Sequence, residues 1–162
     1  MSSSRRQFLA AAATLAAGRA FAELASPNAV GIAMGHLHLN TADLEAQKRF
    51  WILLGATPAK LGPAEVMKIQ NVLILFRKAQ PTGPTEGSIV NHVGFKIPDL
   101  QAYRAKLSGA GFKLLTAEEQ SLKSHKSNVM GPEGINVELV EDKSLTVPIA
   151  NHHVHFYHSP VD

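Results

Sequence analysis

Apolar and polar positions along the chain first predict a unit of one strand, one helix and three strands. Residues 34–40 alternate apolar and polar side chains, which is typical of a strand with one buried face. The stretch 42–54 spaces its apolar residues at helical intervals, with Asn40 or Thr41 as N-cap and Gly55 as terminator. Three short strand-like runs complete the unit, at 57–60, 65–70 and 72–78.

The same order recurs after the polar linker 79–87, which holds two prolines and two glycines. Residues 89–97 are predicted as a strand, and Asp99 is a good N-cap for the helix that follows. Four side chains share one face of that helix, and we expect Tyr103 among them to lie in the core; they are Leu100, Tyr103, Leu107 and Ala110. The remaining predictions are a strand at 112–116, a polar loop at 117–127 and a hairpin of strands 127–130 and 135–141 around the turn 131–134.

A histidine opens the first strand of each unit, and a third histidine-rich stretch follows the second unit. His36 and His92 lie 56 positions apart, and His92 and His153 lie 61 apart. This spacing indicates internal duplication. The tail 144–162 therefore resembles the start of a third unit, and we expect it to be a truncated copy. The alternative is a plain C-terminal strand that happens to be rich in histidine.

Length and charge fit one exported globular domain. The chain has 162 residues and a net charge of +3, but residues 1–22 contain three arginines and no acid, so the remainder has 13 basic and 13 acidic residues. That remainder has no basic stripe, which argues against nucleic-acid binding. Residues 1–22 resemble a twin-arginine signal, with Arg5 and Arg6 before an apolar run that is too short to span a membrane. We expect export to the periplasm, with 23–31 as a linker.

Taken together, these patterns resemble the vicinal oxygen chelate superfamily, which includes glyoxalase I, extradiol ring-cleaving dioxygenases, fosfomycin-modifying enzymes and bleomycin resistance proteins. The stretches that carry the resemblance are GHLHLNTADLEAQKRFWILLGATP, VNHVGFKIPDLQAYRAKLSGAGFK and GPEGINVELVE. The resemblance implies an α+β fold in which two βαβββ modules, 32–78 and 88–143, form an open barrel over residues 32–143.

The resemblance also implies a metal site inside that barrel. The first-strand histidines of the two modules, His36 and His92, match family ligands, and Glu138 matches the glutamate on the last strand. Aligning the two last strands puts Ile74 opposite Glu138, where glyoxalase I has another ligand. This departure counts against a glyoxalase and favours the three-ligand branches.

Strand alternation gives partly independent support for a metal. His36 and His38 share one face of their strand, and so do His92, Gly94 and Lys96, while the opposite faces are apolar. Two imidazoles and a carboxylate form a set that leaves coordination positions open and suits Fe²⁺ or Mn²⁺, with Zn²⁺ or Ni²⁺ as alternatives. The plainer interpretation is that these are hydrogen-bonded structural histidines and that Glu138 lies on a solvated face.

A catalytic acid or base is harder to assign. His38 and His125, the latter in the predicted loop 117–127, are the candidates. We expect a metal-dependent enzyme acting on a small molecule with two adjacent oxygens, most like a ring-cleaving dioxygenase. A glyoxalase-type lyase or isomerase, or a non-catalytic small-molecule binding module, is the alternative.

An unpaired edge strand from the tail would favour a homodimer.

Overall fold

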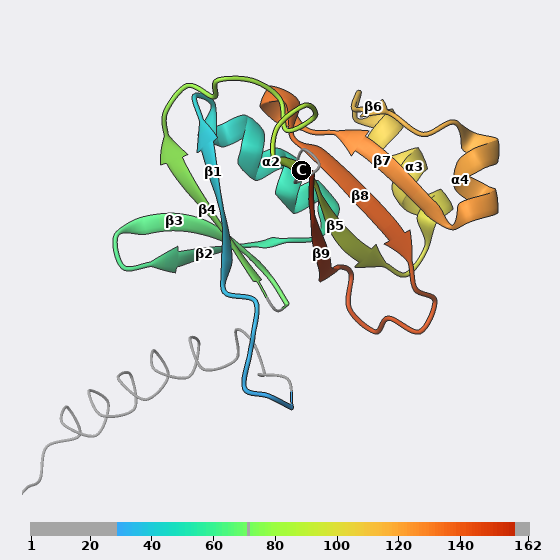
Figure 1. Cartoon of the computed structure of the whole chain (residues 1–162), viewed down its shortest axis with the longest axis horizontal. Helices are drawn as coiled ribbons and strands as arrows, with labels where there is room; N and C mark the ends of the chain where they lie inside the picture. Colours follow the sequence, from blue (N-terminus) through green and yellow to red (C-terminus); the bar gives the residue numbers. More distant parts are fainter. Residues whose placement is uncertain (1–28, 71, 158–162) are drawn as a thin grey trace, which may run out of the picture.

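The computed structural model describes residues 29–70 and 72–157, and its strands form two sheets with helices packed against them (Figure 1). The predicted signal sequence and most of the predicted linker lie outside these residues. The first sheet has the order β1-β4-β3-β2, with β1 parallel to β4 and the other pairs antiparallel. Its elements are β1 (His36–Thr41), α2 (Leu44–Leu54), β2 (Thr57–Leu61), β3 (Ala64–Ile69) and β4 (Val72–Lys78).

The second sheet repeats this topology and adds one strand. Its order is β6-β7-β8-β5-β9, in which β5 runs parallel to β8 and antiparallel to β9. Its strands are β5 (Val90–Ile97), β6 (Lys113–Leu114), β7 (Lys126–Met130), β8 (Asn136–Glu141) and β9 (Ala150–Phe156). The other elements are α3 (Leu100–Gly109), α4 (Glu118–Ser124) and a short 3₁₀ turn η1 (Pro132–Gly134). The βαβββ order predicted for both modules is therefore observed.

Side-chain caps explain where the two long helices begin. The Asp99 carboxylate accepts a hydrogen bond from the backbone N–H of Ala102, as the sequence predicts. In the first module the cap is Asp43, which accepts from Ala46 N–H at 2.8 Å, so the prediction of Asn40 or Thr41 as N-cap was wrong. The strand extends to Thr41, and α2 consequently starts later than its polar flank suggests. Gly55 ends α2 in the left-handed region, with φ of 106°.

One core joins the two modules. Trp51 of α2 is fully buried and packs edge-on against Phe95 of β5, with ring centroids 5.6 Å apart. The Trp51 indole N–H donates to Gln47 Oε1 at 3.1 Å, so the buried indole is satisfied. Tyr103 is buried as expected, with its hydroxyl 3.2 Å from the Leu54 carbonyl oxygen. The helices of both modules therefore share one hydrophobic interior.

Glu133 of η1 links the second module to the first. Its carboxylate accepts hydrogen bonds from the Thr41 hydroxyl, from Ala42 N–H at 2.8 Å and from the Gln47 amide at 3.3 Å. Burial opposes ionisation of Glu133, but these donors outweigh it and lower the pKa of the carboxyl. The end of β1 and the start of α2 are thereby fixed against the β7–β8 turn.

Two anchors hold the segment between β8 and β9. Asp142 accepts hydrogen bonds from the Ser144 hydroxyl and from Lys96 Nζ, and these lower the pKa of Asp142 to about 2. Farther along, the Tyr103 hydroxyl lies 2.5 Å from the Pro148 carbonyl oxygen. The segment is thus tied to β5 and α3 before it enters β9, which fixes where β9 begins.

The polar stretch 117–127 differs from its prediction as a loop. It contains α4, and its last residues begin β7. The helix has no apolar stripe, and Leu122 on it is 41% exposed, so hydrophobic periodicity does not reveal it. Glu118 and Glu119 lie in its first turn, where their negative charges interact favourably with the positive end of the helix dipole and stabilise the helix. Among the described residues, no helix is long and apolar enough to cross a membrane.

Candidate metal centre

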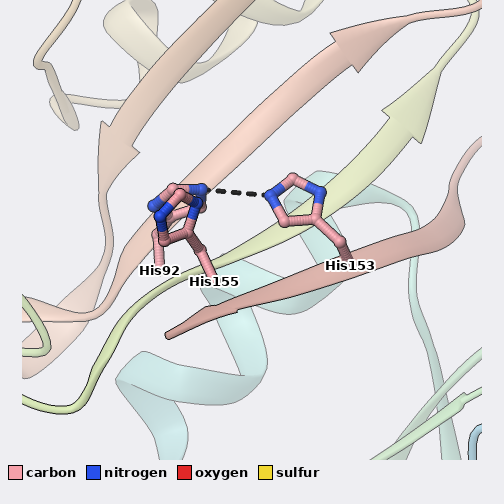
Figure 2. Close-up of side chains that lie close together, drawn as sticks. All are labelled: His92, His153 and His155. Atoms are coloured by element: carbon pink, nitrogen blue, oxygen red, sulfur yellow. Dashed lines mark hydrogen bonds between the residues drawn. The ribbon is translucent and has the colours of Figure 1, made fainter. Parts of the chain in front are cut away.

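Strand register brings a carboxylate and several imidazoles together on the open face of the second sheet. Gly94 of β5 lies between Glu138 of β8 on one side and His153 of β9 on the other. Two residues earlier on β5, His92 pairs with His155 of β9. Three neighbouring strands therefore place four potential ligands over one short stretch of β5, and Figure 2 shows the three imidazoles gathered there.

Three donor atoms form a compact triangle. His92 Nε2 lies 3.1 Å from His153 Nε2, His153 Nε2 lies 3.4 Å from Glu138 Oε2, and His92 Nε2 lies 4.0 Å from the same oxygen. A triangle with these sides has a point about 2.1 Å from every corner, the usual distance from Zn²⁺ or a similar divalent ion to nitrogen and oxygen ligands. The three side chains thus fit one divalent metal ion.

Gly94 makes this approach possible. A Cβ atom on residue 94 would lie 2.2 Å from His153 Cε1 and 2.3 Å from its Nδ1. The imidazole of His153 therefore occupies the space that any other side chain at this position would fill. With no side chain on β5 at this point, the ring of β9 lies across the strand and reaches the carboxylate of β8.

Outer hydrogen bonds orient the two imidazoles. The amide oxygen of Asn91 lies 2.9 Å from His92 Nδ1, so this nitrogen carries the proton and the Nε2 lone pair points to the centre. His153 Nε2 then donates to that lone pair, and its Nδ1 accepts from His152 Nδ1 at 2.9 Å. For His153 Nε2 to bind a cation, the proton of the neutral ring would have to lie on Nδ1, with His152 Nδ1 then acting as its acceptor.

Burial keeps the rings in the form that binds metals. Desolvation lowers the pKa of His92 and of His153, and in each case the Glu138 carboxylate acts in the opposite direction with a smaller effect. The side chain of Glu138 is only 14% exposed. The centre therefore combines two neutral imidazoles with one carboxylate, the donor set that divalent transition metals accept.

His155 is the fourth group at this centre. Donor atoms of His92, His153 and His155 all lie within 4.8 Å of one another. The His155 ring lies 4.5 Å from that of His92 and 4.9 Å from that of Tyr157, measured between centroids. It is placed to act as a further ligand or as a proton-handling group beside the triangle.

The residues proposed from sequence divide between this centre and other places. The structure brings His92 and Glu138 together, but His36 and His38 lie on β1 in the first sheet and line a different cavity. His125, at the end of α4, pairs with Glu141 at 2.9 Å. It lies outside the cluster of His92, His153 and His155. The metal role of His36 and the catalytic roles of His38 and His125 remain predictions.

The strand register also changes one alignment. Gly94 pairs with Glu138, and its counterpart in the first module, His38, pairs with Leu75. Leu75 rather than Ile74 therefore takes the position equivalent to Glu138, while Ile74 is fully buried in the core. Neither side chain binds a metal, so the first module still supplies no carboxylate ligand at this position.

His153 and His155 were not among the residues proposed from sequence, although the repeated pattern pointed to them. HHVHFY at 152–157 matches GHLHLN at 35–40, which makes His153 the equivalent of His36 and His155 that of His38. The pattern does not say which copy pairs with β5. In the structure that copy is β9, in the tail that was predicted to begin a third module.

Comparison with known proteins identifies the fold. No family model and no curated protein matches the sequence. Among solved structures, the fosfomycin resistance protein FosX from Listeria monocytogenes is similar over 68% of this chain and 93% of its own, with a TM-score of 0.57 and 16% identity. The bleomycin resistance determinant encoded on transposon Tn5 matches over 69% and 99%, with a TM-score of 0.51 and 13% identity.

A third similar structure is the lactoylglutathione lyase from Agrobacterium tumefaciens, which matches 75% of this chain and 99% of its own at a TM-score of 0.50 and 16% identity. All three are small proteins of the type that the sequence resembles, and at these identities the likeness concerns the fold. The chain therefore has the α+β fold of the vicinal oxygen chelate superfamily, built from two βαβββ modules with a ninth strand added.

Proposed function

We propose that the protein is a metal-dependent enzyme that acts on a small molecule with two adjacent oxygen atoms. The observation that carries this proposal is the triangle of His92 Nε2, His153 Nε2 and Glu138 Oε2, with sides of 3.1, 3.4 and 4.0 Å. A divalent ion held there would polarise substrate oxygens and orient them. The protein's part is to hold the three donors in place and to keep the imidazoles neutral.

The donor set favours one reaction class. Two histidines and one carboxylate leave coordination positions open, as in non-haem iron oxygenases, so Fe²⁺ or Mn²⁺ is the proposed metal. Ring cleavage by a dioxygenase-like reaction is the proposed chemistry. A glyoxalase-type lyase or isomerase is the alternative, although Leu75 stands where a fourth ligand would be needed. His155, beside His92, is the side chain best placed to take or give a proton.

Metal content tests the proposal directly. Purified protein lacking residues 1–22 would be loaded anaerobically with Fe²⁺, Mn²⁺, Zn²⁺ or Ni²⁺, desalted and measured by inductively coupled plasma mass spectrometry. We expect about one ion per chain, lost in His153→Ala and in Glu138→Ala and retained in His36→Ala. Retention in His153→Ala with loss in His36→Ala would instead favour the ligand set first predicted from sequence.

Substrate class is tested next with the loaded protein. Oxygen uptake with a panel of catechols would support the dioxygenase reaction, and isomerisation of glutathione hemithioacetals would support the lyase alternative. Failure of every metal to bind would overturn the enzyme proposal. A non-catalytic binding module, as in bleomycin resistance, would then be the better description.

Assembly and location are also proposals. β1 is an edge strand of the first sheet and β9 is an edge strand of the second, so each has one open side among the described residues. Open edges favour pairing with a second copy, so we propose a homodimer, which analytical ultracentrifugation would test. We also propose export, on the basis of the leader sequence, which secretion of a reporter fused to residues 1–31 would test.

A further inference from the structure

A cavity lies apart from the metal centre, and its lining contains none of the three donors of that centre. It has a volume of about 470 Å³ and is lined by residues of β1, an edge strand of the first sheet, and of β9, an edge strand of the second. Side chains alternate along β9, so Val154 and Phe156 line this cavity while His153 and His155 belong to the metal centre on the other face. The volume lies within the range of sites for small molecules, roughly 300 to 1,000 Å³.

The cavity wall is mainly apolar and comes from both sheets. Leu37 and Met34 come from β1 and the residues before it, Val90 and Val93 from β5, and Val154 and Phe156 from β9. Phe156 is 62% exposed, a large fraction for an aromatic side chain on a strand. An apolar guest would remove this surface from water, and the burial of apolar surface favours binding.

Two pairs of polar residues in the wall differ in whether their side chains are already hydrogen-bonded. Gln47 and Glu133 also line the cavity, but their side chains are occupied by the hydrogen bonds that link the two modules. His36 and His38 are exposed and lie edge-to-face, with centroids 6.1 Å apart. Neither ring makes a hydrogen bond to any residue that the structure describes. These two imidazoles therefore offer free N–H donors beside an apolar wall.

We infer that this cavity binds a small planar aromatic acid. Its aromatic part would lie against Val154 and Phe156 between the two strand edges, and its acidic group would accept hydrogen bonds from His36 and His38. An anion is favoured over a cation because the donors of the wall are free, whereas its one carboxylate, Glu133, is already occupied. The site is separate from the proposed metal centre and does not depend on it.

Fluorescence titration with anilinonaphthalene sulfonate, an aromatic anion, tests this inference. The full chain should bind the probe saturably at one site, and naphthoate should displace it more effectively than naphthalene methanol of the same shape. The double variant His36→Ala/His38→Ala should bind the probe about tenfold more weakly, as expected for loss of hydrogen bonds to a charged group. Met34 lines the cavity but precedes β1, so Met34→Trp should occupy part of the cavity without changing a strand residue and should weaken binding similarly.

Two control variants distinguish binding in this cavity from binding elsewhere on the molecule. His125→Ala removes a histidine outside the cavity, and Glu138→Gln removes a metal ligand; both should leave the probe affinity unchanged. Circular dichroism would confirm that each variant is folded, because a partly unfolded chain also binds the probe. Absence of saturable binding, or binding unaffected by both cavity variants, would overturn the inference. Binding lost only in Glu138→Gln would place the probe at the metal centre and would overturn it too.

Discussion

Replacing Gly94 by alanine is expected to abolish tight metal binding while leaving the fold intact. The added Cβ would lie 2.2 Å from His153 Cε1, whereas carbon atoms in contact are normally about 3.5–4.0 Å apart. The backbone at Gly94 is paired on both sides, so the imidazole has to move. The His153 side chain is 30% exposed and can turn toward solvent, which removes it from His92 and Glu138.

The magnitude follows from what is lost. Swinging the ring out breaks its two hydrogen bonds to the neutral rings of His92 and His152, so the free energy of unfolding without metal should fall by about 1–3 kcal/mol. Loss of an outer-shell partner costs about 10–100-fold in metal affinity, and loss of a direct ligand should exceed that range. Zn²⁺ affinity measured by competition with a chromophoric chelator should therefore fall by more than about 100-fold.

Gly109 provides the matched control. It lies in α3, where an added Cβ would meet nothing within 4 Å, and alanine suits a helix better than glycine. Gly109→Ala should bind Zn²⁺ with wild-type affinity and unfold at a slightly higher urea concentration. If Gly94→Ala also kept wild-type affinity, His153 would not be a ligand and the proposed centre would be wrong.

Three further changes test the groups around the centre and the anchors of β9. Asn91→Ala removes the acceptor that fixes the His92 ring, so metal affinity should fall about 10–100-fold with little loss of stability, as read by the same titration and by urea unfolding. Tyr103→Phe removes the buried hydroxyl bonded to two carbonyl oxygens, and should lower the free energy of unfolding by about 1–3 kcal/mol. Asp142 has its pKa lowered from 3.8 to about 2, so its ionised form stabilises the fold above pH 3.8 and this contribution is lost as the pH falls through 2. Asp142→Asn should therefore be less stable than wild type at neutral pH, and the difference in unfolding midpoint should disappear in strong acid.

Periodicity was sufficient to predict the modules because each element carries a strong local signal. The alternation of β5 and β8 put His92 and Glu138 on open faces, and the structure places their side chains 4.0 Å apart. Asp99 could be recognised as a cap because a short acidic side chain stands immediately before an apolar helical face. The helix α4 could not, because it packs few apolar residues and its sequence is as polar as a loop.

The composition of the metal centre was harder to predict because it depends on strand order. His36 and His153 occupy equivalent places in the same repeated pattern, and nothing local distinguishes them. One edge of β5 is taken by β8, so only one further strand can pair with it. A long-range competition between two similar strands therefore decides which histidine reaches Glu138.

The structure indicates why β9 rather than β1 takes that edge. β1 is held in the first sheet by its parallel pairing with β4, and its end is fixed by Glu133 through Thr41 and Ala42. The anchors at Asp142 and Pro148 position the start of β9 beside β5. His153 of β9 lies opposite Gly94, and its ring occupies the space that a side chain at position 94 would fill. Gly94 thus leaves room for the ring that the β5–β9 pairing brings opposite it, so the pairing that adds β9 to the sheet also places the third donor of the proposed metal centre.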